Sequence, residues 1–90
     1  MLLYTPYEIA IDLAKRFRLL RKEKKITLKE LSIRSGVPYS TIRRFESEGE
    51  ISLLSFIKIV SAIGEDREIM DLLSEPKPQS IEEIIYANRR

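Results

Sequence analysis

The sequence predicts an all-α protein of five packed helices followed by a short tail helix. Apolar residues recur at spacings of three and four in successive segments, which is the period of one face of an α-helix. Capping residues and glycines stand where these segments begin and end. No segment alternates apolar and polar residues as a half-buried strand does, with the first four residues left open.

The first helix is predicted to begin after Thr5. Thr5 can cap the helix, Pro6 suits the first helical position, and Glu8 completes a capping box. The apolar stripe expected to face the core comprises Ile9, Leu13, Phe17 and Leu20.

The second and third helices are predicted to be short and joined by a tight turn. Thr27 and Glu30 form a capping box at the start of the second helix, and Gly36 ends it because glycine adopts left-handed backbone angles without a steric cost. The turn Val37-Pro38 leads into the third helix, which ends at Gly49.

This pair of helices has the layout of a helix-turn-helix. The layout requires a small residue where the third helix crosses the second, and Ser32 stands there. It also requires apolar residues that hold the two helices together, and these are Leu31, Val37, Ile42 and Phe45. Each condition is weak alone, but their order and spacing together are a strong signal.

Ser52 is expected to cap a fourth helix that ends at Gly64 and whose apolar residues are Leu53, Phe56, Ile57, Val60 and Ile63. A fifth helix is predicted over residues 65–74. We therefore divide the chain into an N-terminal extension (1–5), a helix-turn-helix domain (6–74), a proline-containing linker (75–79) and a tail helix (80–90).

Composition narrows the function. The 90 residues include no cysteine and no histidine, which disfavours a disulfide, a metal site and a Ser-His or Cys-His nucleophile. We predict a protein that is not an enzyme and uses no metal or other cofactor. The N-terminus lacks signal-peptide features and the longest apolar run is too short to span a bilayer, which predicts a cytoplasmic protein without a membrane partner.

Charge is unevenly distributed along the chain. Residues 1–45 hold eleven Lys/Arg and four Asp/Glu, a balance of +7, whereas residues 46–90 hold five and ten, a balance of −5. This asymmetry indicates a polyanion-binding N-terminal half and a C-terminal half that faces something else.

At this point the chain resembles the Cro/phage-repressor type of helix-turn-helix protein, the XRE family. The segments "FRLLRKEKKITLKELSIRSGVPYSTIRRFE" and "ISLLSFIKIVSAIG" carry the likeness, which extends over roughly residues 9–73. It implies a lambda-repressor-like domain and a homodimeric repressor that binds a palindromic operator in double-stranded DNA. The "FE" end of the third helix, the apolar fourth helix and the small size look most like HipB-type antitoxins, which implies a kinase-like toxin as a partner.

The resemblance also implies roles for individual residues. Arg21 and Glu46 match a buried ion pair of the family, and the base-reading positions match Tyr39, Ser40, Arg43 and Arg44. On a helical wheel of about 100° per residue these four side chains share one arc of about 140°, opposite the core pair. Arg44 is the better candidate for reading a base, whereas Arg43 could as easily hold a phosphate.

Phosphate contacts are expected at the start of the second helix, from Lys25, Lys29 and the free N–H groups there. Leu28 stands where many relatives have glutamine, so only its backbone N–H is expected to contribute. The loop after the third helix is one residue longer than in relatives, and its Glu48 and Glu50 would repel a phosphate, which leaves Ser47 as the candidate there.

The two-fold interface of a dimer is expected to come mainly from the fifth helix, with the residues Ile69, Met70, Leu72 and Leu73. The alternative is a protein-interaction module that neutralises a partner through its acidic C-terminal half, and the two roles can coexist. The tail helix could reinforce the dimer or dock on a partner, or its low apolar count could leave it frayed in isolation, and the sequence leaves these alternatives open.

Overall fold

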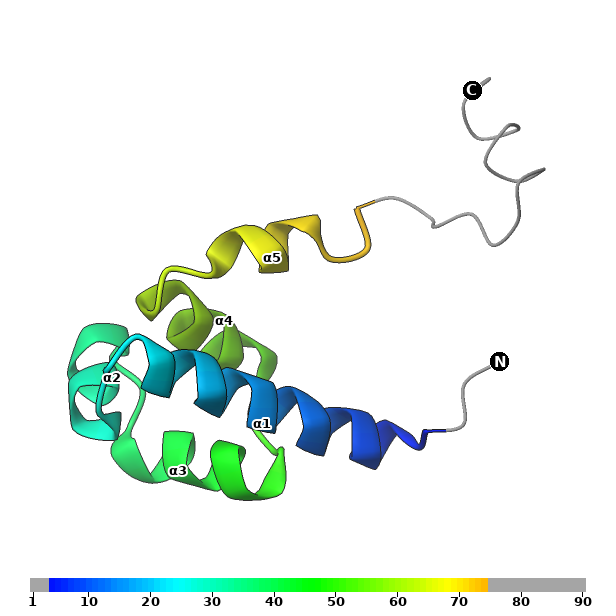
Figure 1. Ribbon diagram of the computed structural model, residues 1–90, viewed down its shortest axis with the longest axis horizontal. Coiled ribbons are helices and arrows are strands. Elements are labelled where there is room, and N and C mark those ends of the chain that lie inside the picture. Colours follow the sequence, from blue (N-terminus) through cyan, green and yellow to red (C-terminus); the bar gives the residue numbers. More distant parts are fainter. Residues whose placement is uncertain (1–3, 75–90) are drawn as a thin grey trace.

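The computed structural model describes residues 4–74, so the predicted linker and tail helix and the first three residues of the chain lie outside the described part (Figure 1). Five helices make up the described residues, with no strand among them: α1 (Pro6–Glu23), α2 (Leu28–Ser35), α3 (Tyr39–Glu48), α4 (Leu53–Ala62) and α5 (Asp66–Asp71). The predicted all-α class is confirmed.

Local capping chemistry fixes where the helices begin. The side chains of Thr5 and Thr27 each accept a hydrogen bond from the backbone of a glutamate three residues later, Glu8 and Glu30, whose carboxylates accept from the backbone of the threonines. These bonds from backbone N–H groups, and weaker ones from the threonine hydroxyls, lower the pKa of both carboxyls. The predicted capping boxes are therefore present at α1 and α2.

The arrangement of the helices puts α3 and α5 on opposite sides of α1 in Figure 1. Helix α1 packs against α3, α2 packs against both α3 and α4, and α5 packs against α4. The deepest side chains are Leu31, Ile42 and Ile59, one from each of α2, α3 and α4, and all have no exposed surface.

Three aromatic rings join the helices around this core. The rings of Phe17 and Phe45 meet edge to face with centroids 5.7 Å apart, and Phe45 meets Phe56 in the same way at 5.4 Å. This is the geometry that aromatic side chains prefer. The three rings link α1, α3 and α4, and so fix α3 relative to the rest of the domain.

The predicted core stripe of α1 is wrong at its N-terminal end. Ile9 and Leu13 are exposed at 43% and 38%, and the buried residues of this helix are Ala14, Phe17 and Arg21. Figure 1 shows the reason, since the N-terminal end of α1 extends beyond α3 and α4 and has no helix to cover it there.

Leu53, the first residue of α4, is 73% exposed, and the buried residues of this helix are Ile59 and Val60. One expectation for the C-terminal half is wrong. Helix α5 ends at Asp71 and not at Ser74. Leu72 and Leu73 are exposed at 64% and 92%, so no burial stabilises a further turn.

Candidate nucleic-acid interface

Helices α2 and α3 form a helix-turn-helix whose inner side is closed by apolar contacts. Val37 and Phe45 are each 2% exposed and pack with the fully buried Leu31 and Ile42. Ser32 is half-buried, and its hydroxyl donates to the carbonyl oxygen of Val37 at 2.7 Å. A small side chain at this position therefore lets α3 approach α2 and also anchors the turn.

The turn itself depends on one residue with left-handed backbone angles. Gly36 has φ 75° and its N–H donates to the carbonyl oxygen of Ser32. The N–H of Val37 donates to the hydroxyl of Ser35 at 3.1 Å. These bonds set the angle at which α3 leaves α2.

The outward face of α3 carries the four candidate base-reading residues. Tyr39 is 47% exposed, and Ser40, Arg43 and Arg44 are also exposed, while Ile42 is buried on the opposite face. The structure thus brings the four together on a single surface of one helix.

The two arginines of this face have different surroundings. Arg44 Nη2 lies 2.6 Å from Glu50 Oε1, and Arg44 Nε lies 3.8 Å from Glu48 Oε1. Arg43 makes no ion pair with any residue in the described part of the chain. The sequence reasoning identified both glutamates but not their contact with Arg44. The four-residue spacing to Glu48 could have shown one contact, whereas Glu50 reaches Arg44 only because the loop turns back.

The far end of α3 is tied to α1 by a buried ion pair. Arg21 Nε donates to Glu46 Oε2 at 2.7 Å and Arg21 Nη2 donates to Glu46 Oε1 at 2.9 Å, and both side chains are only 7% exposed. Arg21 Nη1 donates to the carbonyl oxygen of Ile26 at 2.7 Å. Arg18 lies at the edge of the pair, with Nε 3.9 Å from Glu46 Oε1.

The candidate phosphate-binding residues lie at two places. Lys25 and Lys29 are exposed at the start of α2, where Lys25 has a φ of 59°, unusual for a residue with a side chain. Leu28 is the first residue of α2, and its side chain packs against the core. Ser47 is exposed at the end of α3, and its hydroxyl donates to the carbonyl oxygen of Arg44 at 3.3 Å.

The candidate interface residues, in α5 and directly after it, form an exposed apolar edge. Met70, Leu72 and Leu73 are exposed at 77%, 64% and 92%, whereas Ile69 is half-buried against α4. Beside them lies a groove of about 250 Å³ between α1, α4 and α5, with Phe56 and Val60 among its apolar lining residues.

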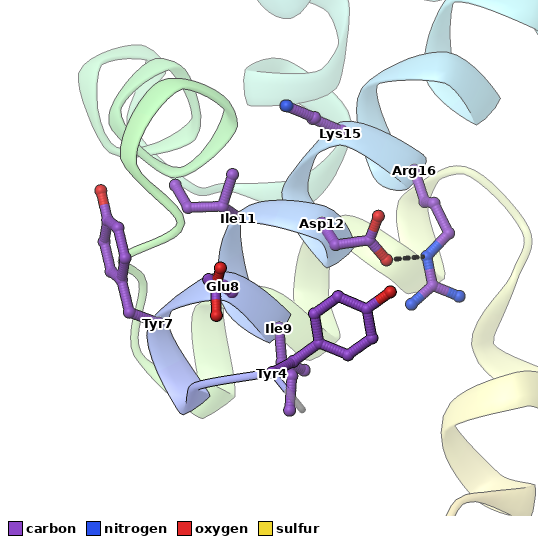
Figure 2. A pocket seen from close by; sticks show the side chains of 8 residues that line it. All are labelled: Tyr4, Tyr7, Glu8, Ile9, Ile11, Asp12, Lys15 and Arg16. Carbon is purple, nitrogen blue, oxygen red and sulfur yellow. Dashed lines mark ion pairs between the residues drawn. The ribbon is translucent and has the colours of Figure 1, made fainter. Parts of the chain in front are cut away.

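A larger hollow, of about 580 Å³, follows the first three turns of α1 (Figure 2). All its lining residues come from the single segment 4–16, and Figure 2 shows Tyr4 and Tyr7 pointing to opposite sides of the helix. Asp12 and Arg16 form an ion pair of 3.0 Å across one side of it. It is an open furrow along one helix, and its charged lining residues are Glu8, Asp12, Lys15 and Arg16.

Residues 4–74 contain neither a candidate metal site nor a candidate membrane-spanning helix. Histidine, cysteine, aspartate and glutamate do not gather there in groups of three that could hold a metal ion. None of the described helices combines the length and the apolar composition needed to cross a membrane.

Comparison with known protein families gives one match. The model of the family described as Helix-turn-helix matches residues 17–69, which is more than half of the 90 residues. The matched range contains α2, α3 and α4 in full and begins partway along α1. No curated protein and no solved structure matches the chain.

Proposed function

The chain belongs to the helix-turn-helix family of DNA-binding transcription regulators, and from this we propose that it is a sequence-specific repressor acting as a homodimer. The observation that carries the proposal is the outward face of α3, where four side chains able to bind DNA are exposed together. None of the four is needed for the core, because Ile42 and Phe45 perform that role on the opposite face.

In the proposed complex α3 lies in the major groove. Arginine can bind guanine through its O6 and N7 atoms with two hydrogen bonds, which makes Arg44 and Arg43 the candidate readers of guanine. Tyr39 and Ser40 stand in the first turn of α3, the part of a recognition helix that approaches base edges and phosphates most closely.

The start of α2 is proposed to bind a phosphate of the DNA backbone. Lys25 and Lys29 supply positive charge, and the N–H groups of Leu28 and Lys29 lie in the first turn of the helix, where N–H groups favour anions. Ser47, after the recognition surface, is the candidate for a second phosphate. These contacts supply affinity for any duplex and position α3.

A dimer would use the apolar edge formed by Ile69 and Met70 of α5 and by Leu72 and Leu73 directly after it. An apolar edge this exposed on one chain is a reason to expect a second copy against it. The adjacent groove has charged residues of both signs at its rim, Arg16 on one side and Glu65 and Glu68 on the other. A two-fold contact needs such self-complementarity. Two recognition helices related in this way would read half-sites about 34–36 Å apart in a palindromic operator.

A second candidate function is that of an antitoxin that holds a kinase-like toxin. The observation that favours it is the excess of acidic residues after residue 45, together with the apolar groove of α1, α4 and α5 on the side away from α3. This role would leave the recognition surface free, so it is compatible with repression of transcription.

The deciding experiment is DNA binding by the purified full chain. Selection from a random duplex pool should yield a palindromic site, and binding should weaken steeply as salt rises because several phosphates are neutralised. If no duplex binds even at low salt, the repressor proposal is wrong.

Single variants then separate base contacts from phosphate contacts. Arg44→Ala should weaken binding to the selected site by about 5- to 150-fold, the range of one base contact, and relax preference at one position. Lys29→Ala should weaken all duplexes alike and reduce the salt slope by about one. Arg67→Ala and Lys58→Ala are the matched controls, since they remove exposed charges from α5 and α4.

A further inference from the structure

Arg44 is the one candidate base reader whose charged group is held by other side chains of the described domain. Glu50, in the loop between α3 and α4, contacts its Nη2 atom at 2.6 Å, and Glu48, one turn further along α3, faces its Nε atom at 3.8 Å. Arg44 and the two glutamates are more than half exposed, so the cluster lies on the surface that faces DNA in the proposed complex.

We propose that Glu50 is a specificity-determining residue, which positions Arg44 for base reading and disfavours binding to non-cognate DNA. The inference rests on the proposed function, and it adds a residue that lies outside the recognition helix. Two independent physical effects support it.

The first effect is positioning. A guanidinium has five N–H donors in one plane, and it can donate to a carboxylate from one edge while another edge donates to a base. Glu50 and Glu48 lie beside Nη2 and Nε, whereas Nη1 has no acceptor within residues 4–74. An arginine held in this way loses less side-chain freedom when it binds guanine, so the cognate complex is favoured.

The second effect is charge. Binding to random DNA depends almost entirely on contacts between positive side chains and phosphates. An Arg44 already paired with Glu50 gains little from a phosphate, and the carboxylates of Glu48 and Glu50 repel one. These two glutamates therefore reduce binding to arbitrary sequences more than binding to a site where Arg44 meets a guanine.

Stability is not the expected role of this cluster. Ion pairs between exposed side chains contribute little to folding because water screens them. Glu50→Gln should therefore leave the thermal unfolding midpoint unchanged within error, and any change in DNA binding can be assigned to the interface itself.

The experiment compares the full chain with its Glu50→Gln variant on two duplexes of equal length, the selected site and a random sequence. The variant should bind the random duplex more tightly, and the ratio of the two affinities should fall at least about fivefold, the lower end of what one base contact provides. Selection repeated with the variant should show relaxed preference at the same base position that Arg44→Ala relaxes.

Two control variants separate charge from contact. Glu23→Gln removes the same charge from an exposed position of α1 that makes no ion pair within residues 4–74, and it should leave the affinity ratio unchanged. Glu50→Asp keeps the charge but shortens the side chain by one methylene, so it should relax the base preference without strengthening binding to random DNA.

The outcomes are distinguishable. An unchanged ratio together with an unchanged base preference would overturn the inference, as would a ratio that rises, since Glu50 would then merely hold Arg44 away from DNA. Failure of the unmodified chain to bind duplex DNA would instead overturn the proposed function, and this is measured before any variant is tested.

Discussion

The buried pair of Arg21 and Glu46 should be the most sensitive point of the domain. Both side chains are 7% exposed, and they share two hydrogen bonds of 2.7 and 2.9 Å. Replacing one partner leaves the other charge buried without its counterion, which costs about 3–5 kcal/mol. A chain of 90 residues has a total stability of about 5–13 kcal/mol, so either change should remove a large part of it.

The two single variants are not equivalent. Arg21→Met strands the Glu46 carboxylate, but Arg18 Nε already lies 3.9 Å away and can approach it. Glu46→Leu strands the Arg21 guanidinium, which has no second carboxylate among its contacts in residues 4–74 and keeps only the carbonyl oxygen of Ile26. We therefore expect Glu46→Leu to be at least as destabilising as Arg21→Met.

The double variant provides the decisive test. With both charges removed, the main remaining defect is the carbonyl of Ile26, which loses its donor at a cost of about 1–3 kcal/mol. The double variant should therefore be more stable than either single variant.

Urea unfolding, followed by the helical circular dichroism signal, measures the free energy of unfolding of the two single variants and the double variant. All are compared at one protein concentration, so that association does not affect the comparison. Asp12→Asn is the control, because its pair with Arg16 is of similar length, 3.0 Å, but is 63–65% exposed and should contribute only about 0.3–0.5 kcal/mol. If a single variant at Arg21 or Glu46 lost no more than this control, or if the double variant lost as much as the sum of the singles, the reasoning would be refuted.

Four further variants test other features of the domain. Lys25→Gly should raise the free energy of unfolding by up to about 1 kcal/mol, because glycine adopts the φ of 59° without the steric strain of a side chain. It should also weaken binding to all duplexes. Urea unfolding measures the first effect and DNA titration the second, and unchanged DNA binding would remove Lys25 from the proposed phosphate site. Gly36→Ala should cost about 1–2 kcal/mol for its φ of 75° alone. Gly49→Ala should cost about 1–3 kcal/mol more than that, since a Cβ there would lie 3.1 Å from the backbone of α1, and equal losses in unfolding experiments would contradict this contact. Hydrogen bonds lower the pKa of Glu8 and Glu30 in the folded chain, so the stability that these carboxylates contribute is present above the ordinary glutamate pKa of about 4.3 and is lost as the pH falls through the lowered pKa. The urea midpoint of a Glu30→Gln variant should therefore fall less steeply in acid than that of the unmodified chain. An identical pH profile would speak against the capping box.

Helix boundaries were predictable because capping chemistry is local. Thr5 and Thr27 each need only a glutamate three residues later, and Gly36 and Gly49 each need only to follow the last helical turn. The predicted end of α5 was wrong because no such signal stands there, and the apolar Leu72 resembled a continuing helix.

The core was less predictable than the helices. Spacing identifies an apolar face, but it does not say which part of that face a neighbouring helix will cover. In α1 the sequence favoured the large residues Ile9 and Leu13, whereas the small Ala14 is 1% exposed in the core of a helix that packs against α3. Close approach of two helices selects a small side chain, and this requirement is visible only once the crossing is known.

For the candidate site, the sequence was sufficient to predict which side chains of α3 point outward, because a helical wheel needs no tertiary information. It could not give the partner of Arg44. Glu48 is four residues away on the same helix, but Glu50 lies beyond the end of α3, and its position depends on the direction in which the chain leaves Gly49.

The direction in which the chain leaves Gly49 depends on a contact with α1, and it places Glu50 beside Arg44 on the recognition surface. Gly49 has a φ of 76°, and a Cβ on it would lie 3.1 Å from the backbone of both Ala10 and Ile11, so the loop rests directly on α1. The contact involves the part of α1 that precedes the family match, which begins at residue 17. The N-terminal turns of α1 that leave Ile9 exposed therefore support the loop that holds Glu50 beside Arg44. The N-terminal part of α1 contributes little to the core, but its contact with the loop at Gly49 helps to position the surface that is proposed to read DNA.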